Sequence, residues 1–396
     1  MLLRFGSGRA RASSRRSALG FGWLGLLLCL IAFGARADAV SGTWTGSVSL
    51  RGNYYYERST RVIAPAFTGS LATPQGIRMD ATYLLDAITS ASVATGVQDD
   101  VAFTEKRHDF TAGAGYEFDF GGVQLDLAAS GRMSREPDYK SRGVGFAPVL
   151  SLNERNTMLR LNGYYIHDDV ARVERSLPSS GGSLTAAKPV PVGTLDTLSL
   201  GFAIDQLLSP LAWATLGYDL AILSGFTANP YRSVTFPGGG VPVPESHPDE
   251  RYRHAVYGWL QHSIPPMHAS LRAGYRLYKD DWEILAHAVE GRVYQELGPH
   301  VELRLRYRYY TQSSSFFWGN DRAQYMQTGY ASADPKMTAF HDHTFGFKLR
   351  LALGFLQGTW ANAMRNVVID GTLEYIINTN RYGNGWVSQG GLIWPF

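Results

Sequence analysis

Cysteine is almost absent from this sequence. The 396 residues include one cysteine, Cys29, which lies in an apolar run near the N-terminus. Disulfide scaffolds, zinc-thiolate sites and cysteine nucleophiles are therefore excluded from the rest of the chain. Charged residues are also scarce, at 18% against a usual value of about 25%. A disordered or coiled-coil chain would carry more charge.

Long hydrophobic runs are missing after Ala37. No stretch of eighteen apolar residues follows it, and the most hydrophobic region, 207–223, is interrupted by Pro210 and Asp219. A membrane-spanning helix needs about 20 apolar residues, so helical spans are excluded there.

The N-terminal segment is basic and then apolar. Acidic residues are absent before Asp38, an apolar run covers 18–33, and Ala35-Arg36-Ala37 follows. This order predicts a secretory signal peptide over 1–37 and a mature chain over 38–396. An uncleaved anchor is the alternative, although the run is shorter than a span. Cleavage would leave 31 basic and 34 acidic residues, a net charge of −3, so nucleic acid is not an expected partner.

Hydrophobic residues in the mature chain alternate with a period of two. The clearest case runs from Val301 to Tyr309, where Glu302, Arg304 and other polar residues alternate with apolar ones. A strand separates these two sets onto opposite faces, whereas a helix would mix them. Small residues and terminal aromatics dominate the apolar faces, as on a lipid-facing surface with interfacial girdles. We therefore predict an all-β, transmembrane antiparallel up-and-down β-barrel in the outer membrane of a Gram-negative bacterium. A soluble sandwich is the alternative.

The pattern predicts about sixteen strands, an even number as bacterial barrels require. They are expected to begin near Thr43, Val62, Ile77, His108, Val123, Val144, Thr157, Thr194, Leu211, Arg251, Met267, Trp282, His300, Phe340, Asn366 and Trp386. Long connections over 88–107, 167–193, 224–250 and 313–338 tend to alternate with tight ones. Both termini are then expected in the periplasm and the long loops outside. The Pro- and Gly-rich segments 178–193 and 236–248 are expected to act as mobile lids or lumen plugs.

The C-terminal strand carries a further signal. Trp386, Leu392, Trp394 and Phe396 share one face, and Phe396 is the last residue. The pattern resembles the terminal strand by which the barrel-insertion machinery recognises outer-membrane barrels, so this machinery and outer-membrane lipid are the expected partners. Nothing in the pattern indicates an oligomeric state.

Charged side chains on the polar faces are candidate pore-lining residues. The later strands are basic and the early strands acidic, and the candidates are Arg272, Arg276, Arg304, Arg306, Arg308, Lys348, Arg350, Asp80, Asp86, Asp109, Glu117 and Asp126. A sixteen-stranded barrel is wide enough for an aqueous channel, whose opposed charges would sort small polar solutes. Alternatively, the charges pair across strands and fill a closed lumen.

The pair His341 and His343 stands two residues apart on one side of a strand. Such a pair could hold a metal or serve a hydrolase. Because no Gly-x-Ser-x-Gly or His-Glu-x-x-His motif is present, we expect rim histidines bonded to neighbouring backbone, with no catalytic, cofactor or metal site. The loop pair Asp99-Asp100 offers too few carboxylates for a cation site.

Ordered blocks along the mature chain show a family resemblance. They are 86–92, 136–141 with Asn156-Thr157, 229–232, Tyr275-Arg276, 280–282, 308–312 and 332–336. Together they resemble a domain-of-unknown-function family of Gram-negative outer-membrane proteins, with Pro335-Lys336 departing from the family pattern. The resemblance implies a barrel without an assigned substrate.

Three functions remain open. We expect a passive pore or transport channel for small polar or anionic solutes. The alternatives are a non-conducting surface barrel that is structural or binds a partner, and an outer-membrane hydrolase.

Overall fold

The computed structural model describes residues 43–58, 60–90, 103–173, 188–381 and 383–396. Trp44–Phe396 forms one compact unit. The expected signal peptide over 1–37 lies outside the described residues and stays a prediction. The same holds for Asp99, Asp100 and the segment 178–187.

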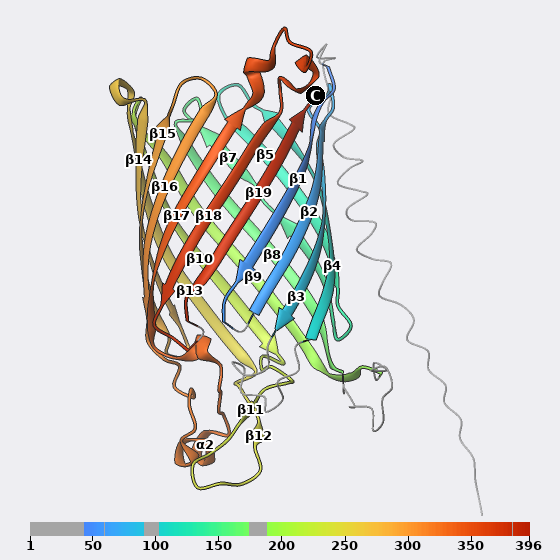
Figure 1. The fold of residues 1–396 in the computed structure, drawn as a ribbon, viewed down its shortest axis with the longest axis vertical. Helices are drawn as coiled ribbons and strands as arrows, with labels where there is room; N and C mark the ends of the chain where they lie inside the picture. Colours follow the sequence, from blue (N-terminus) through green and yellow to red (C-terminus); the bar gives the residue numbers. More distant parts are fainter. Residues whose placement is uncertain (1–42, 59, 91–102, 174–187, 382) are drawn as a thin grey trace, which may run out of the picture. The chain divides into compact units, whose positions relative to one another are not determined.

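The unit is a closed antiparallel barrel. Its strands are β1 (Thr45–Tyr56), β2 (Thr60–Ala72), β3 (Arg78–Ser90), β4 (Phe103–Asp119), β5 (Gln124–Arg135), β6 (Tyr139–Phe146), β7 (Val149–Leu152), β8 (Thr157–Arg172), β9 (Val190–Ser209), β10 (Ala212–Gly225), β13 (Glu250–Ile264), β14 (Ala269–Asp280), β15 (Leu285–Glu296), β16 (Val301–Gln312), β17 (Phe340–Ala352), β18 (Val368–Asn378) and β19 (Gly385–Pro395). Successive strands pair with each other, except that β6 and β7 both pair with β5 and β8, and β19 pairs with β1. The red β19 beside the blue β1 in Figure 1 marks this closure.

The last residue helps to close the ring. The backbone N–H groups of Gly46 and Phe396 each donate to the other residue's carbonyl at 2.9 Å. A Cβ on Gly46 would lie only 2.6 Å from the carbonyl oxygen of Ser70. Gly46 is therefore needed where the Phe396 strand meets β1.

The predicted count of sixteen spans is confirmed, with β6 and β7 forming one interrupted span. Both pair with β5 and β8, and the break falls at Ala147-Pro148, because proline has no N–H to donate to the ladder. Three spans begin four or five residues earlier than predicted: β4 at Phe103 instead of His108, β6 at Tyr139 instead of Val144 and β9 at Val190 instead of Thr194. In β4 and β6 the alternation continues through charged residues.

The outer face of the barrel is apolar. Leu305, Tyr307 and Phe347 are exposed on it, and Trp394 and Phe396 lie on the same face near the closure. Among the described residues, no helix is long and apolar enough to cross a membrane. The closed ladder of strand pairs satisfies the backbone polar groups of the wall without water, and the apolar outer face suits lipid, as spanning the outer membrane requires. The protein is an outer-membrane β-barrel.

The two barrel ends differ in their connections. Long connections join strands at one end, the long-loop end, and carry the hairpin of β11 (Ser233–Val234) and β12 (Val243–Pro244), helix α2 (Arg322–Thr328) and the 3₁₀ turn η3 (Pro335–Met337). Figure 1 shows β11, β12 and α2 beyond the strand ends, away from the C-terminus. The other end, the short-turn end, has tight turns such as η2 (Pro265–Met267), and one longer connection with η4 (Leu353–Leu356) and η5 (Asn362–Met364).

Candidate functional site: the barrel interior

The acidic candidates lie on the face opposite the exposed apolar residues, which is the barrel interior. Most of them are paired with arginines of nearby strands and turns. Ion pairs join Asp86 to Arg107 (2.8 Å), Asp109 to Arg132, Glu117 to Arg155 (2.6 Å) and Asp126 to Arg78. Asp80 lines a cavity nearby. The early strands are thus less anionic than their carboxylates alone would make them.

The basic candidates also point inward, from β14, β16 and β17. Arg306 bonds Glu290 at 3.0 Å and Glu374 at 2.8 Å. Lys348 pairs with Asp370 at 3.1 Å. The remaining pairs join Arg276 to Asp219 at 2.9 Å and Arg350 to Glu302 at 3.9 Å.

A stack of aromatic and guanidinium groups crosses this basic wall. The guanidinium of Arg272 lies 4.4 Å from the ring centre of Trp259 and 5.1 Å from that of Trp213, and the guanidinium of Arg292 lies 5.1 Å from the Trp259 ring. A Cβ on Gly274 would clash with the Trp259 ring at 2.3 Å, so the glycine leaves the space that the ring occupies. Cation–π contacts of this kind hold the side chains in place without neutralising their charge.

Four inward arginines have no carboxylate within 4.0 Å among the described residues: Arg253, Arg272, Arg304 and Arg308. In three of them, Arg253, Arg272 and Arg304, the Nε–H is buried and has no protein acceptor in the described part of the chain. Buried donors are normally satisfied. These groups are therefore available to an anion or to water.

A basic cavity of about 370 Å³ lies near the long-loop end of this wall. Its cationic lining comes from β13, β14, β16 and η3, and comprises Arg251, Arg253, Arg276, Arg308 and Lys336. Tyr278 and Tyr310 contribute hydroxyl groups. Within the described part of the chain, only two of these cations have a carboxylate bound: Arg251 pairs with Asp280 at 2.5 Å and Arg276 with Asp219.

A larger cavity of about 940 Å³ opens at the short-turn end beside β1–β8. Small side chains dominate its lining, including Ser47, Ser70, Gly113, Ser130 and Gly145. Because these side chains project little into the interior, they leave more free space at this end than the arginine and tryptophan side chains of the basic wall leave beside them.

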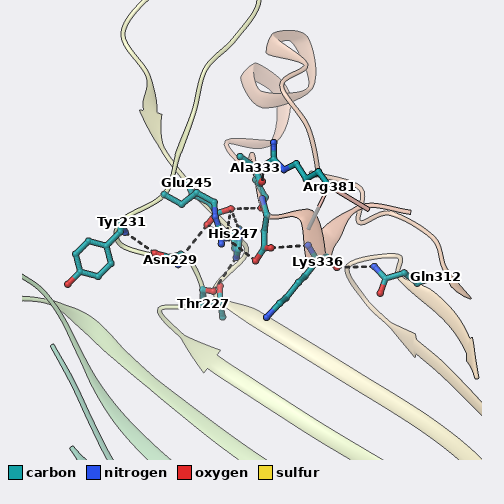
Figure 2. Close-up of polar contacts among 12 residues, drawn as sticks. Thr227, Asn229, Tyr231, Glu245, His247, Gln312, Ala333, Lys336 and Arg381 are labelled. Carbon is teal, nitrogen blue, oxygen red and sulfur yellow. Dashed lines mark hydrogen bonds and ion pairs between the residues drawn. The ribbon is translucent and has the colours of Figure 1, made fainter. Parts of the chain in front are cut away.

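Two long-loop-end connections are locked together by a buried charged cluster (Figure 2). Arg232 pairs with Glu245 at 3.1 Å and with Asp334 at 2.9 Å, and the Glu245 side chain is 0% exposed. The hydroxyl of Ser332 donates to Glu245, and His247 lies 3.4 Å from it. The segment 236–248, expected as a mobile lid or lumen plug, is instead anchored to the β16–β17 connection through Glu245 and Ser246.

Glu245 is ionised in this cluster. Burial alone would raise its pKa, but the close contact with His247, the charge of Arg232 and the hydrogen bond from Ser332 outweigh burial and hold the pKa below the ordinary value. The cluster therefore depends on a carboxylate that is charged at neutral pH.

Lys336, at the departure from the family pattern, links the loop to the barrel rim. Its N–H donates to Asp334 Oδ1 at 2.9 Å, and its carbonyl accepts from the Gln312 amide at 2.9 Å (Figure 2). The side chain lines the basic cavity.

His341 and His343 face outward, on the same side of β17 as Phe345 and Phe347. The hydroxyl of Tyr307 lies 3.0 Å from Nδ1 of His343, so its partner is a side chain and not the backbone that we expected. In the described part of the chain, no three His, Cys, Asp or Glu side chains form a group that could hold a metal ion.

Sequence reasoning missed Arg251, Arg253, Trp259 and Lys336. The alternation of Arg251 and Arg253 at the start of β13 could have placed both inward with the basic candidates. The position of Lys336 depends on how a connection of more than twenty residues folds, which alternation does not predict.

Comparison with curated proteins gives no match. Solved structures with a similar arrangement include OprD from Pseudomonas aeruginosa, with 9% identity over 91% of this chain and 97% of that chain and a TM-score of 0.44. OccAB1 from Acinetobacter baumannii has 9% identity over 91% of this chain and 98% of that chain, with a TM-score of 0.40. A mutant of the ferric enterobactin receptor PfeA from Pseudomonas aeruginosa has 9% identity over 87% of this chain and 54% of that chain, with a TM-score of 0.44.

One family model matches most of the barrel. It covers residues 98–375, which is more than half of the chain and extends from the region of β4 into β18. The chain therefore belongs to the family described as "Protein of unknown function (DUF3570)".

Proposed function

We propose that this barrel is a passive outer-membrane channel for small polar solutes and that it prefers anions. The basic cavity of about 370 Å³ carries the proposal, because two of its arginines, Arg253 and Arg308, have no carboxylate partner among the described residues. The pore-lining role of the twelve candidate residues belongs to the same proposal.

The electrostatic reason is the uneven distribution of paired charge. Arg107 and Arg132 neutralise carboxylates on the early strands, whereas Arg272 and Arg304 on the opposite strands keep uncompensated charge. Walls of low dielectric focus this field and raise the local concentration of anions. The wider space beside β1–β8 then leaves a path for the solute and its water.

A non-conducting barrel is the second candidate. The bonds of Arg306 to Glu290 and Glu374, and of Lys348 to Asp370, support it, because they pair inward charges along the wall formed by β15–β18. If such networks close the whole interior, the protein has a structural or partner-binding role.

Planar-bilayer recording of the refolded protein distinguishes the channel from the non-conducting barrel. We expect steady conductance and a reversal potential under a salt gradient that indicates anion preference. The double variant Arg304→Gln/Arg308→Gln should reduce that preference, and the effect should shrink at high salt as screening increases. These two arginines are the right targets because neither forms an ion pair with any described residue.

Lys279→Gln is the matched control. Lys279 is an exposed cation on β14 and alternates with the inward Tyr278 and Asp280, so its loss should leave selectivity unchanged. A wild-type protein that conducts nothing would refute the channel and favour the second candidate. Conductance with equal selectivity in wild type and double variant would refute the anion site.

A further inference from the structure

The outer wall carries a repeated tyrosine motif near the long-loop end. In seven of the eight strand pairs joined at that end, a tyrosine lies directly opposite an apolar residue of the next strand. The pairs are Tyr54 with Ile63, Tyr83 with Phe110, Tyr165 with Leu198, Tyr218 with Val256, Tyr275 with Val289, Tyr307 with Phe345 and Tyr375 with Trp386.

Each of these tyrosines also contacts a polar side chain two residues nearer the long-loop end. Its hydroxyl lies 2.8 Å from His108 in one pair and 2.7 Å from His254 in another. The remaining partners are Arg61, Asp196, His287, His343 and Asn384. Tyrosine with its ring toward apolar residues and its hydroxyl toward polar ones marks the boundary between hydrocarbon and headgroups.

We call the seven tyrosines together the tyrosine girdle. The strand pair β5–β6 interrupts this girdle. Met133 occupies the tyrosine position, and Arg142 lies opposite it where the other pairs have an apolar residue. Met133 is 64% exposed and Arg142 is exposed beside it. An arginine is thus placed on the lipid-facing wall at the level of the headgroup boundary.

Further cations surround this break. Lys106, Arg135 and Lys140 are exposed on the same face of β4, β5 and β6, with Arg135 paired in register with both His108 and Lys140. None of the three, nor Arg142, has an ion pair among the described residues. One carboxylate on this face, Asp169, lies in register with Lys140 but is 3.8 Å from His167 Nε2 and forms no ion pair with the lysine. Val144 and Phe146 continue the wall toward the short-turn end as exposed apolar residues.

We propose that Lys106, Arg135, Lys140 and Arg142 form a binding site for the phosphorylated glycolipid of the outer leaflet. We call these four residues the basic girdle patch. Charge complementarity favours an anionic headgroup, and the apolar surface of Met133, Val144 and Phe146 below the patch fits acyl chains. A lipid with phosphates in its headgroup and several acyl chains fits both the basic patch and the apolar surface next to it. Its phosphates would pair with the arginines and so offset the cost of exposing arginine to lipid.

The site is independent of the proposed channel, because its side chains point away from the interior. Its position in the outer leaflet follows from the long-loop end facing the outside. Because four cations contribute at a membrane surface, loss of two should weaken binding by about tenfold or more.

The test uses the full-length refolded barrel in detergent, with purified bisphosphorylated lipid A as the probe and native mass spectrometry as the readout. Wild type should retain lipid A more strongly than dephosphorylated lipid A or phosphatidylglycerol. The variant Arg135→Gln/Arg142→Gln should lose about tenfold or more of the lipid A binding. The variant Arg61→Gln/Lys279→Gln removes two exposed cations outside the patch, and should bind like wild type.

Heat-dependent gel mobility should verify that every variant is folded. If the glutamine variant does not fold, the variant Arg135→Lys/Arg142→Lys keeps the charges and should bind lipid A like wild type. The comparison of the three lipids on the wild-type protein then still tests whether the site prefers a phosphorylated glycolipid. Equal lipid A binding by wild type and the glutamine variant would overturn the site. So would equal loss in the control pair, or phosphatidylglycerol binding as tight as lipid A.

Discussion

Arg232 and Glu245 form an ion pair of 3.1 Å that joins two segments of the β10–β13 connection, beside β11 and β12. The Glu245 side chain has no exposed surface and the Arg232 side chain has 7%. Arg232 also pairs with Asp334 of the β16–β17 connection. One buried guanidinium therefore holds two connections that are far apart in sequence.

Glu245→Ala should loosen both connections. The substitution leaves Arg232 and the Ser332 hydroxyl without this acceptor, and breaking one side of a buried ion pair costs about 3 to 5 kcal/mol. Hydrogen exchange should increase in 226–249 and 313–339 and stay unchanged in the barrel strands. Glu154→Ala, which removes an exposed carboxylate from a short turn, should change neither. Unchanged exchange in Glu245→Ala would show that other contacts hold the connections.

Acid should also loosen these connections in the wild-type protein. The pKa of Glu245 is lower in the folded connection than its ordinary value of 4.5, so the unfolded connection binds the proton more readily. The contribution of Glu245 is complete above about pH 4.5 and is lost as the pH falls through the lower folded pKa. Exchange in 226–249 should therefore rise over that range in wild type. In Glu245→Gln, which cannot ionise, the rise should be smaller, and an equal rise in both proteins would contradict this assignment.

The barrel could be predicted from the sequence because every span repeats one simple rule. Alternation such as that from Val301 to Tyr309 places each side chain inside or outside, and Pro148 interrupts a span without changing the count. The inward direction of all twelve candidate residues follows from the same rule. The ion-pair partners of these residues could not be predicted by this rule. The pairing of Arg306 with Glu374, for example, depends on register between strands separated by a long connection.

The contacts of the tyrosine girdle also could not be predicted from the sequence. The residues His341 and His343 suggested chemistry while they were considered along one strand. Only the pairing of β17 with β16 shows that His343 meets Tyr307, as His287 meets Tyr275 elsewhere. A contact between diagonal neighbours on two strands is set by register, which the periodicity of a single strand does not contain.

The two faces of β16 should differ in their tolerance of charge. Leu305 is exposed on the lipid-facing side near the middle of the strand, whereas Arg304 faces inward and has no carboxylate partner in the part of the chain that the structure describes. Leu305→Arg should lower the free energy of unfolding by about 2 to 4 kcal/mol if it lies near the bilayer midplane. Arg304→Leu should cost much less, because no ion pair is broken. Refolding titrations in lipid vesicles measure both, and equal costs would contradict the register of β16.

The orientation of the barrel can be tested with single cysteines, because the only native one, Cys29, lies in the expected signal peptide. Val241 is 89% exposed in the β11–β12 hairpin at the long-loop end, and Trp360 is 100% exposed in the longer connection at the short-turn end. Short turns face the periplasm in outer-membrane barrels. A membrane-impermeant maleimide should therefore label Val241→Cys on intact cells and Trp360→Cys only after the outer membrane is ruptured. Wild-type cells report any background from Cys29. Labelling of Trp360→Cys alone on intact cells would reverse the orientation and move the basic girdle patch to the inner leaflet.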